Sequence, residues 1–223
     1  MAQQERAAKT RRTVLRAAAV VFDRHGYARA SIAEILEEAQ VTKGALYFHF
    51  PSKEALAKAL MEEQIDSVEV PPVEGSPLQA TIDLTQAVAA SVLHDPMLRA
   101  GTRLAVESAF EDAINPWDAW AKVIEELLTE AQRQGELMPH VVPRETAELF
   151  VAAFTGIQLF SLARSKREDL GERITVLWQH LLPTIAFPAL LARLKPEGRA
   201  TPAVTAAPAV TAAPAASGDP QLS

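Results

Sequence analysis

The sequence predicts an all-α protein with a small N-terminal domain and a larger helical domain behind it. Alanine and leucine are abundant, whereas aromatic residues make up only 6% of the chain. Apolar residues recur at helical spacing, and Pro or Gly interrupts these stretches where helices would begin or end. The 223 residues allow one or two domains with a sizeable core. We divide the chain into residues 1–52, residues 53–195 and a tail of residues 196–223.

Composition and charge narrow the function. The chain has no cysteine, which excludes disulfides and cysteine-based metal sites. No apolar stretch approaches the length of a membrane span and the charged N-terminus is unlike a secretory signal, so we expect a cytoplasmic protein without membrane contact. Residues 1–60 carry ten Lys and Arg against six Asp and Glu, a balance of +4, and the rest carries 12 against 22. Unless this asymmetry is chance scatter, the first part can bind phosphate although the whole chain is acidic, because salt screens charges beyond about 10 Å.

A basic helix opens the chain and is predicted to end near Gly26. Arg11 and Arg12 in this helix either contact phosphates or are ordinary solvated charges, and the sequence leaves both interpretations open. Residues 31–50 then predict a helix-turn-helix. Ser31 caps a first short helix with Glu34 as its capping-box partner, and Thr42 caps a second one.

The residue types of the second short helix favour DNA over an ordinary helical hairpin, which the pattern alone would also allow. Small residues at its start let the backbone approach base edges, and Thr and Lys supply donors for phosphate or guanine. The candidate DNA-contact residues are Ser31, Thr42, Lys43, Gly44, Ala45, Tyr47, His49 and Lys53.

Helices are expected in the larger part over about 53–68, 78–94, 96–110, 116–135 and 145–165, with a further one around Ile174 to Leu182. Pro183 and Pro188 are expected to bend or break the segment from Thr184 to Leu194. The helix over 145–165 is apolar on nearly every side and the next one is also strongly apolar. These two helices therefore predict a four-helix bundle across a two-fold axis, with a buried hairpin in a monomer as the alternative. The Ala/Pro/Thr repeat after Pro196 predicts a disordered or polyproline-like tail.

The run VTKGALYFHFPSKEAL, together with the F-x-x-x-G-Y-x-x-x-S-I spacing before it, resembles the DNA-binding signature of the TetR family of bacterial repressors. The match covers about the first quarter of the chain. It implies that the helix from Lys53 links a DNA-binding head to a ligand domain. It also implies a homodimer, formed through the last long helices, that binds a palindromic double-stranded operator.

Further residues are similar to the γ-butyrolactone receptor branch of that family, which regulates antibiotic production in streptomycetes. These residues are the P-W-x-x-W run at 116–120, the ALYFHF run at 45–50 and Gln64. By this resemblance Trp120 and Gln64 line a ligand pocket. The branch's third polar position, often Thr, falls at Ile157, so Thr155 or Gln158 would have to substitute for it, or the ligand differs. The candidate ligand-binding residues are Gln64, Trp117, Trp120, Phe154, Thr155 and Gln158.

Two other classes of protein compete with a ligand-released repressor. The five histidines are scattered, with no HExxH pair and no nucleophile motif, so we expect neither an enzyme nor a bound metal or cofactor. The second competitor is a DNA-binding protein whose larger domain is only a rigid dimer platform. For either tryptophan of the 116–120 run taken alone, core packing remains the alternative to a ligand contact.

Overall fold

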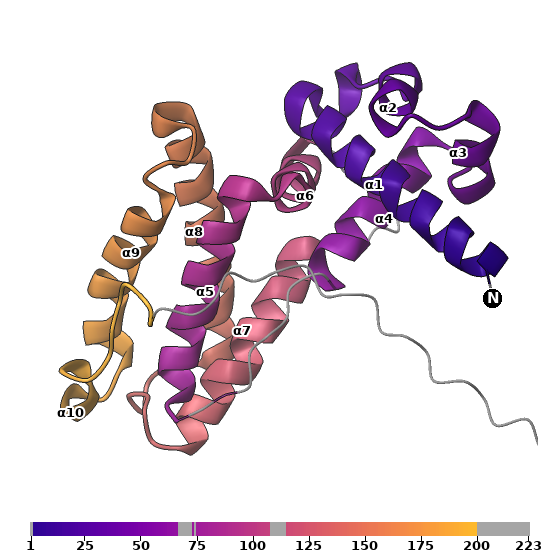
Figure 1. The fold of residues 1–223 in the computed structure, drawn as a ribbon. Coiled ribbons are helices and arrows are strands. Elements are labelled where there is room, and N and C mark those ends of the chain that lie inside the picture. The colour runs from indigo at the N-terminus through magenta and orange to yellow at the C-terminus, as the bar shows by residue number, and fades with distance from the viewer. Residues whose placement is uncertain (1, 67–72, 74, 108–114, 200–223) are drawn as a thin grey trace, which may run out of the picture.

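The computed structural model describes residues 2–66, 73, 75–107 and 115–199, and ten helices span these residues (Figure 1). In the described ranges the only β-type pairing is an isolated bridge between Leu137 and Ala186. The all-α prediction is therefore confirmed. The helices are α1 (Ala2–Arg29), α2 (Ile32–Ala39), α3 (Lys43–His49), α4 (Lys53–Asp66), α5 (Pro77–His94), α6 (Pro96–Glu107), α7 (Pro116–Arg133), α8 (Pro143–Ser165), α9 (Leu170–Ile185) and α10 (Pro188–Leu191).

Helices α1 to α4 form a head at one end of the molecule, and its turns use the predicted caps (Figure 1). Gly26 breaks α1 with φ 74° and ψ 168°, close to the predicted end. Ser31 and Glu34 form both halves of a capping box, and the hydrogen bonds from Ser31 lower the pKa of the Glu34 carboxyl. The Thr42 hydroxyl accepts the backbone N–H of Ala45 at 3.2 Å. These local contacts orient α2 against α3.

The core of the head extends beyond the three N-terminal helices. Phe22, Leu46 and Leu56 are fully buried in it, and the first half of α4 contributes further apolar side chains. Met97 and Leu104 of α6 complete the same cluster. The boundary predicted at residue 52 therefore crosses a core that the head shares with α4 and α6.

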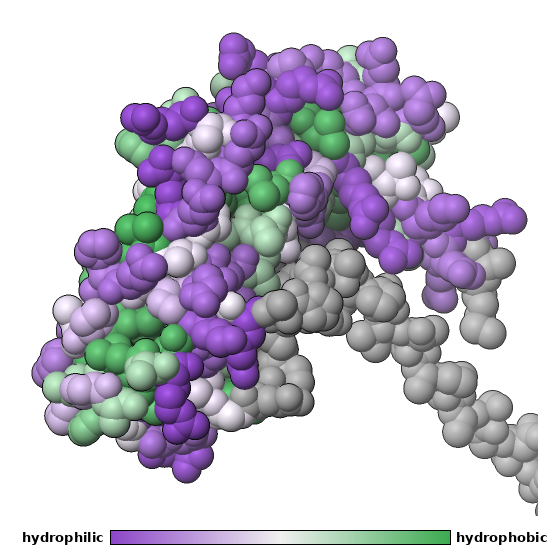
Figure 2. Space-filling model, turned by 60° about the vertical axis from the view of Figure 1, so that its left-hand side comes forward, coloured by the Kyte–Doolittle hydropathy of each residue, from purple (hydrophilic) through white to green (hydrophobic). Residues whose placement is uncertain are grey.

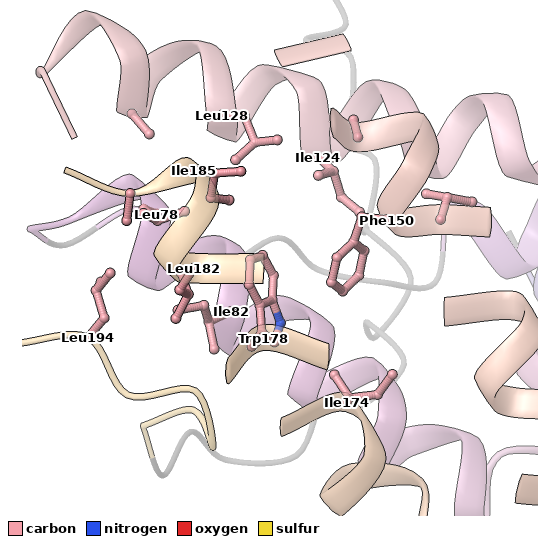
Figure 3. Packing of buried hydrophobic residues seen from close by; sticks show 14 of the residues in the cluster. Leu78, Ile82, Ile124, Leu128, Phe150, Ile174, Trp178, Leu182, Ile185 and Leu194 are labelled. Atoms are coloured by element: carbon pink, nitrogen blue, oxygen red, sulfur yellow. The ribbon is translucent and has the colours of Figure 1, made fainter. Parts of the chain in front are cut away.

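The larger body is built around Trp178, which lies among Phe150, Ile82 and Leu182 (Figure 3). Its ring stacks on Phe150 with centroids 4.7 Å apart. Its indole Nε1 donates to the Thr85 hydroxyl at 2.9 Å, so the polar edge of a buried tryptophan is satisfied. Through these contacts Trp178 of α9 fixes α5 and α8 in relation to each other.

Helix α8 corrects one expectation. This 23-residue helix is, by length and composition, apolar enough to cross a bilayer, because an 18-residue stretch within it has a mean hydropathy of 1.4. Its apolar residues serve two sides: Phe150 and Val151 are buried in the body, whereas Leu149 is 60% and Phe160 51% exposed. Such a composition in a water-facing helix indicates a second surface that another molecule can cover.

Helix α9 shares this open apolar surface. Figure 2 shows apolar patches between polar ones on the face that comes forward when the α8 and α9 side of Figure 1 turns toward the viewer. The exposed large apolar residues of the two helices are Leu149, Leu159, Phe160, Leu162 and Val176. Pro183 does not break α9, which runs on to Ile185 because a proline near the end of a helix removes only one terminal hydrogen bond.

Residues 195–199, called the strap below, lie along α5 instead of beginning the predicted disordered tail. The Gln79 side chain accepts from the Lys195 N–H at 2.8 Å and donates to the Lys195 carbonyl at 3.2 Å. The buried Asp83 carboxylate accepts the Arg199 N–H at 2.7 Å and pairs with its guanidinium at 2.7 Å. The tail prediction is therefore wrong for residues 196–199, and its remainder lies outside the described residues.

Candidate functional site: a DNA-reading face and an apolar pocket

Helix α3 presents a surface that its own fold does not use. Its spacing turns Leu46 inward, together with the adjoining Phe50, and leaves Lys43 and Gly44 exposed. Tyr47 is 40% and Phe48 80% exposed. We call Thr42, Lys43, Gly44, Tyr47 and Phe48 the reading face. A short, convex helix with this surface can enter the major groove of DNA, which is about 12 Å wide.

Neither packing nor backbone conformation requires a glycine at position 44. A Cβ built at this position would meet no atom within 4 Å, and its φ is not in the left-handed region. Glycine inside a helix costs about 0.5–1 kcal/mol relative to alanine. The missing side chain is therefore best explained by the close approach of another molecule, as the sequence predicts for a base edge.

Phe48 belongs to the reading face although it is not among the residues predicted from the sequence. It lies one helical turn after Gly44, which puts both on one face, and that spacing could have identified it. Its ring meets His49 edge-on with centroids 5.0 Å apart, while the Lys43 ammonium lies 5.8 Å from the Tyr47 ring. An exposed phenyl ring suits contact with a thymine methyl group.

Other candidate DNA contacts have internal partners. The Lys53 ammonium donates to the carbonyls of Tyr27 and Ala30 at 2.8 and 2.9 Å, holding the corner between α1 and α2. Arg11 pairs with Glu63 at 2.8 Å, whereas Arg12 is exposed. A role of Lys53 on DNA, like the roles of Ser31, Ala45 and His49, remains a prediction.

The body encloses a pocket between α4, α5, α6, α7 and α8. The cavity measures about 60 Å³, several times what one water molecule requires. All six predicted ligand-binding residues line it: Gln64, Trp117, Trp120, Phe154, Thr155 and Gln158. The other walls are mainly apolar, and none of the described residues that line it is charged. Ile157, the position of the family's polar residue, lies outside the pocket on the outer side, between α8 and α9.

The hydroxyl groups of the pocket threonines already donate hydrogen bonds to backbone carbonyls. Thr155 donates to the Val151 carbonyl at 2.9 Å, Thr102 to Leu98 at 3.1 Å and Thr85 to Ile82 at 2.9 Å. Gln158 differs, because it is 2% exposed and its Nε2 has no acceptor among the described residues. A buried amide donor without a partner costs about 1–3 kcal/mol. A ligand oxygen placed there would relieve that cost, so Gln158 suits the polar role better than Thr155.

Gln64 connects the pocket to the head. It is 4% exposed near the end of α4, and it packs directly over Gly101 of α6. A Cβ at position 101 would overlap the Gln64 Oε1, so only glycine admits this arrangement. The sequence indicates that a helix can pack closely at Gly101, but it does not indicate that Gln64 is the residue that packs there.

Ionic contacts and hydrogen bonds join the head to α6 along the length of that helix. Asp23 pairs with Arg99 at 2.6 Å, and its carbonyl accepts from Arg103 at 2.6 Å. Glu107 accepts the Tyr27 N–H at 3.1 Å, beside the kink at Gly26. No group of three His, Asp or Glu side chains that could hold a metal ion occurs among the residues described.

Comparison with known proteins agrees with this arrangement. The profile "Bacterial regulatory proteins, tetR family" matches residues 14–60, and "Tetracyclin repressor-like, C-terminal domain" matches residues 75–186. The A-factor receptor protein of Streptomyces griseus is 50% identical over 199 residues, which cover 89% of this chain and 72% of that protein.

Two solved structures extend the match to three dimensions. TylP, a TetR regulator from Streptomyces fradiae, superposes with a TM-score of 0.78 at 40% identity, over 86% of this chain and 93% of that one. A γ-butyrolactone receptor described as ArpA-like gives 0.68 at 31% identity, over 84% and 94%. The chain therefore belongs to the TetR family of bacterial regulators, in its γ-butyrolactone receptor-like branch.

Proposed function

We propose that this ligand-responsive transcriptional repressor binds a palindromic operator as a homodimer and leaves it when a γ-butyrolactone, butenolide or furan fills the pocket. On the strength of the family resemblance, we place antibiotic production among the processes that it controls. It would act in the cytoplasm, where the chromosome lies, and we assign it no enzymatic activity. The alternative inducer is an antibiotic or another hydrophobic compound.

The observation that carries the proposal is that α4 belongs to both functional regions. Leu56 and Leu60 in its first half are fully buried in the core of the head. Gln64, one turn after Leu60, lines the pocket. A ligand that presses on Gln64 therefore acts on the helix that also belongs to the core of the head, and through α4 it can shift the head that carries the reading face.

The pocket chemistry favours a neutral ligand with a carbonyl oxygen. Within the described parts of the chain no charged side chain lines the pocket, so a bound carboxylate or ammonium would find no partner there to offset its lost hydration. The Gln158 Nε2 offers a donor to a lactone carbonyl, and Trp120 offers a flat apolar face for the ring. The remaining apolar walls suit an alkyl chain.

The mechanism is a shift between two populations. The ligand-free dimer keeps both reading faces at the operator spacing, about one helical turn of DNA or ~34 Å apart or somewhat more. The ligand stabilises a form in which the heads are displaced. A change from mostly bound to mostly released requires about 10⁴-fold tighter binding to the displaced form.

The dimer is proposed from the open apolar surface of α8 and α9. Phe160 is 51% and Val176 49% exposed, and both line the groove between these helices. Arg173 lies 4.7 Å from the Phe160 ring and pairs with Asp169, whose pKa is held well below its ordinary value by Arg173, Ser161 and Ser165. This surface combines apolar and charged side chains, and it can pack against the same surface of a second copy across a two-fold axis.

The test is a titration of operator-bound protein with a synthetic γ-butyrolactone, monitored by fluorescence anisotropy of labelled DNA. Release at micromolar lactone supports the proposal. Release by an antibiotic alone favours the alternative inducer, and binding that persists with every compound favours a rigid DNA-binding platform. Sedimentation of the free protein tests the dimer separately, since a monomer at micromolar concentration would contradict it.

A further inference from the structure

An open groove runs along the outside of the body between α7 and α8, next to the pocket. We call it the outer groove. Its lining residues are Trp117, Asp118, Ala121, Glu148, Val151, Ala152 and Thr155. Three of them, Trp117, Val151 and Thr155, also line the pocket. Side chains that line both spaces separate them, so the wall between pocket and solvent is one side chain thick at this place.

Of these three side chains, Trp117 is the one that can move at little cost. Val151 is 8% exposed in the middle of α8, and the Thr155 hydroxyl is bonded to the Val151 carbonyl at 2.9 Å. Trp117 is partly exposed in the first turn of α7, and within the described chain its indole makes no hydrogen bond. Its backbone is held by Asn115, whose Oδ1 accepts the Trp117 N–H at 3.0 Å. The ring can therefore rotate while the helix start stays in place.

Other walls of the pocket are fixed more firmly. Phe150 is 2% exposed and stacked on Trp178, and Thr85 accepts a hydrogen bond from the Trp178 indole. Leu84 and Ile124 are 1% and 3% exposed. Opening a route through any of them would disturb the close-packed core. The passage past Trp117 disturbs only a side chain at the surface.

We propose that ligands reach the pocket from the outer groove and that Trp117 is the gate between the two. This inference rests on the proposed receptor function and adds the route. Trp117 controls how fast a ligand binds and leaves. Trp120 lines the pocket and not the groove, so it controls how tightly the ligand is held. The two neighbouring tryptophans thus have separable kinetic and equilibrium roles.

The mouth of the route also selects by charge. Asp118 makes no ion pair among the described residues, whereas Glu148 pairs with Arg144 at 2.9 Å. Asp118 therefore contributes a negative charge that disfavours the approach of anions and leaves neutral compounds unaffected. This agrees with a pocket whose lining, as far as the structure describes it, includes no cationic side chain to receive an anion.

The test measures exchange of Nile red, a neutral apolar dye, with the full-length protein by stopped-flow fluorescence. Trp117→Ala is expected to raise the association rate about tenfold, and the dissociation rate at least as much, because Trp117 also lines the pocket. Trp120→Ala is expected to weaken binding through dissociation alone. An unchanged association rate in Trp117→Ala, or an equal rise of the association rate in Trp120→Ala, overturns the gate.

A second variant tests the route with the opposite sign. Ala152 is exposed and lines the groove but not the pocket. Ala152→Trp should slow both rates about tenfold without changing Kd, while Ala90→Trp, at an exposed position of α5 that lines neither space, should change nothing. Equal rates in these two variants, or no binding of Nile red to the unmodified protein, also overturn the proposal. If the dye behaves as expected but no γ-butyrolactone releases DNA, the gate stands and the proposed ligand class falls.

Discussion

The reading face and the pocket use polar groups in opposite ways. On the reading face Lys43 and Tyr47 keep donors open to solvent, and Gly44 leaves a space that no internal atom fills. In the pocket the threonine hydroxyls donate hydrogen bonds to backbone carbonyls, and the Gln158 Nε2 donor is buried. The face comes from one short helix and its cap, whereas the pocket is assembled from five helices.

Substitutions therefore have different consequences in the two regions. A substitution on the reading face removes a contact with a partner and leaves the fold intact, because the side chains do not pack internally. A substitution in the pocket acts on both the ligand and the core, since the same side chains line both. Variants that damage one function without the other therefore test the division directly.

The largest effect is expected from Lys43→Ala combined with Tyr47→Ala. Losing two contacts of about 1–3 kcal/mol each should lower operator affinity by about 100-fold or more. Fluorescence anisotropy measures the affinity, and circular dichroism should show an unchanged helix content. Lys122→Ala, an exposed lysine of α7, is the matched control. Normal operator affinity in the double variant would contradict the reading face.

Trp120→Ala is expected to keep operator affinity while the concentration of inducer needed for release rises by about 100-fold, because the pocket loses its largest flat contact. Trp178→Ala is the comparison, since truncation of a fully buried aromatic residue costs about 3–5 kcal/mol. Release titrations and thermal unfolding separate the two variants. If Trp120→Ala unfolds as readily as Trp178→Ala, Trp120 belongs to the core and not to the ligand site.

Gly101→Ala tests the connection between the two regions. The new methyl group would overlap the Gln64 side chain and displace it from the pocket wall. We expect about a tenfold weaker inducer response, the scale of one lost hydrogen bond. Gly171→Ala is the control, because the nearest atom to its Cβ is 3.8 Å away. An unaltered release curve for Gly101→Ala would show that Gln64 does not take part in the response.

The smallest effects are expected from Gly44→Ala, which should stabilise the fold but weaken operator binding. Alanine should raise the free energy of unfolding by about 0.5–1 kcal/mol, because it favours the helix. The same methyl group should weaken operator binding several-fold by holding α3 away from the bases. Urea unfolding and DNA titration give the two values. A variant that is more stable and binds DNA equally well would refute the close approach.

The head could be predicted from sequence because its determinants are local. Ser31, Glu34 and Thr42 specify their caps within three residues, and all three behave as predicted. Of the six pocket candidates, Trp120 and Gln64 came from the resemblance, with Thr155 and Gln158 as substitutes for its third polar position. The choice between Thr155 and Gln158 depends on hydrogen bonds that form only in the folded helix, although a threonine donating to the carbonyl four residues earlier is a general tendency.

Longer-range features had no signal in the sequence. The core shared by the head with α6, and the contact of Gln64 with Gly101, join segments far apart in the chain. The sequence predicts that α8 is apolar on nearly every side, but not that it is long and apolar enough to cross a bilayer, because polar residues such as Gln158 and Ser161 are distributed among its apolar ones. Pattern reasoning also placed the tail too early, since the strap depends on Gln79 and Asp83 more than a hundred residues before it.

The strap sets a practical limit on how the protein can be shortened or fused. A chain cut before Lys195 would leave the Asp83 carboxylate, which is 6% exposed, buried without its guanidinium. Such a trimmed form would be fragile for reasons unrelated to gene regulation. Purification tags and reporter proteins are therefore better joined after Arg199, so that the hydrogen bonds of the strap to Gln79 and Asp83 are kept.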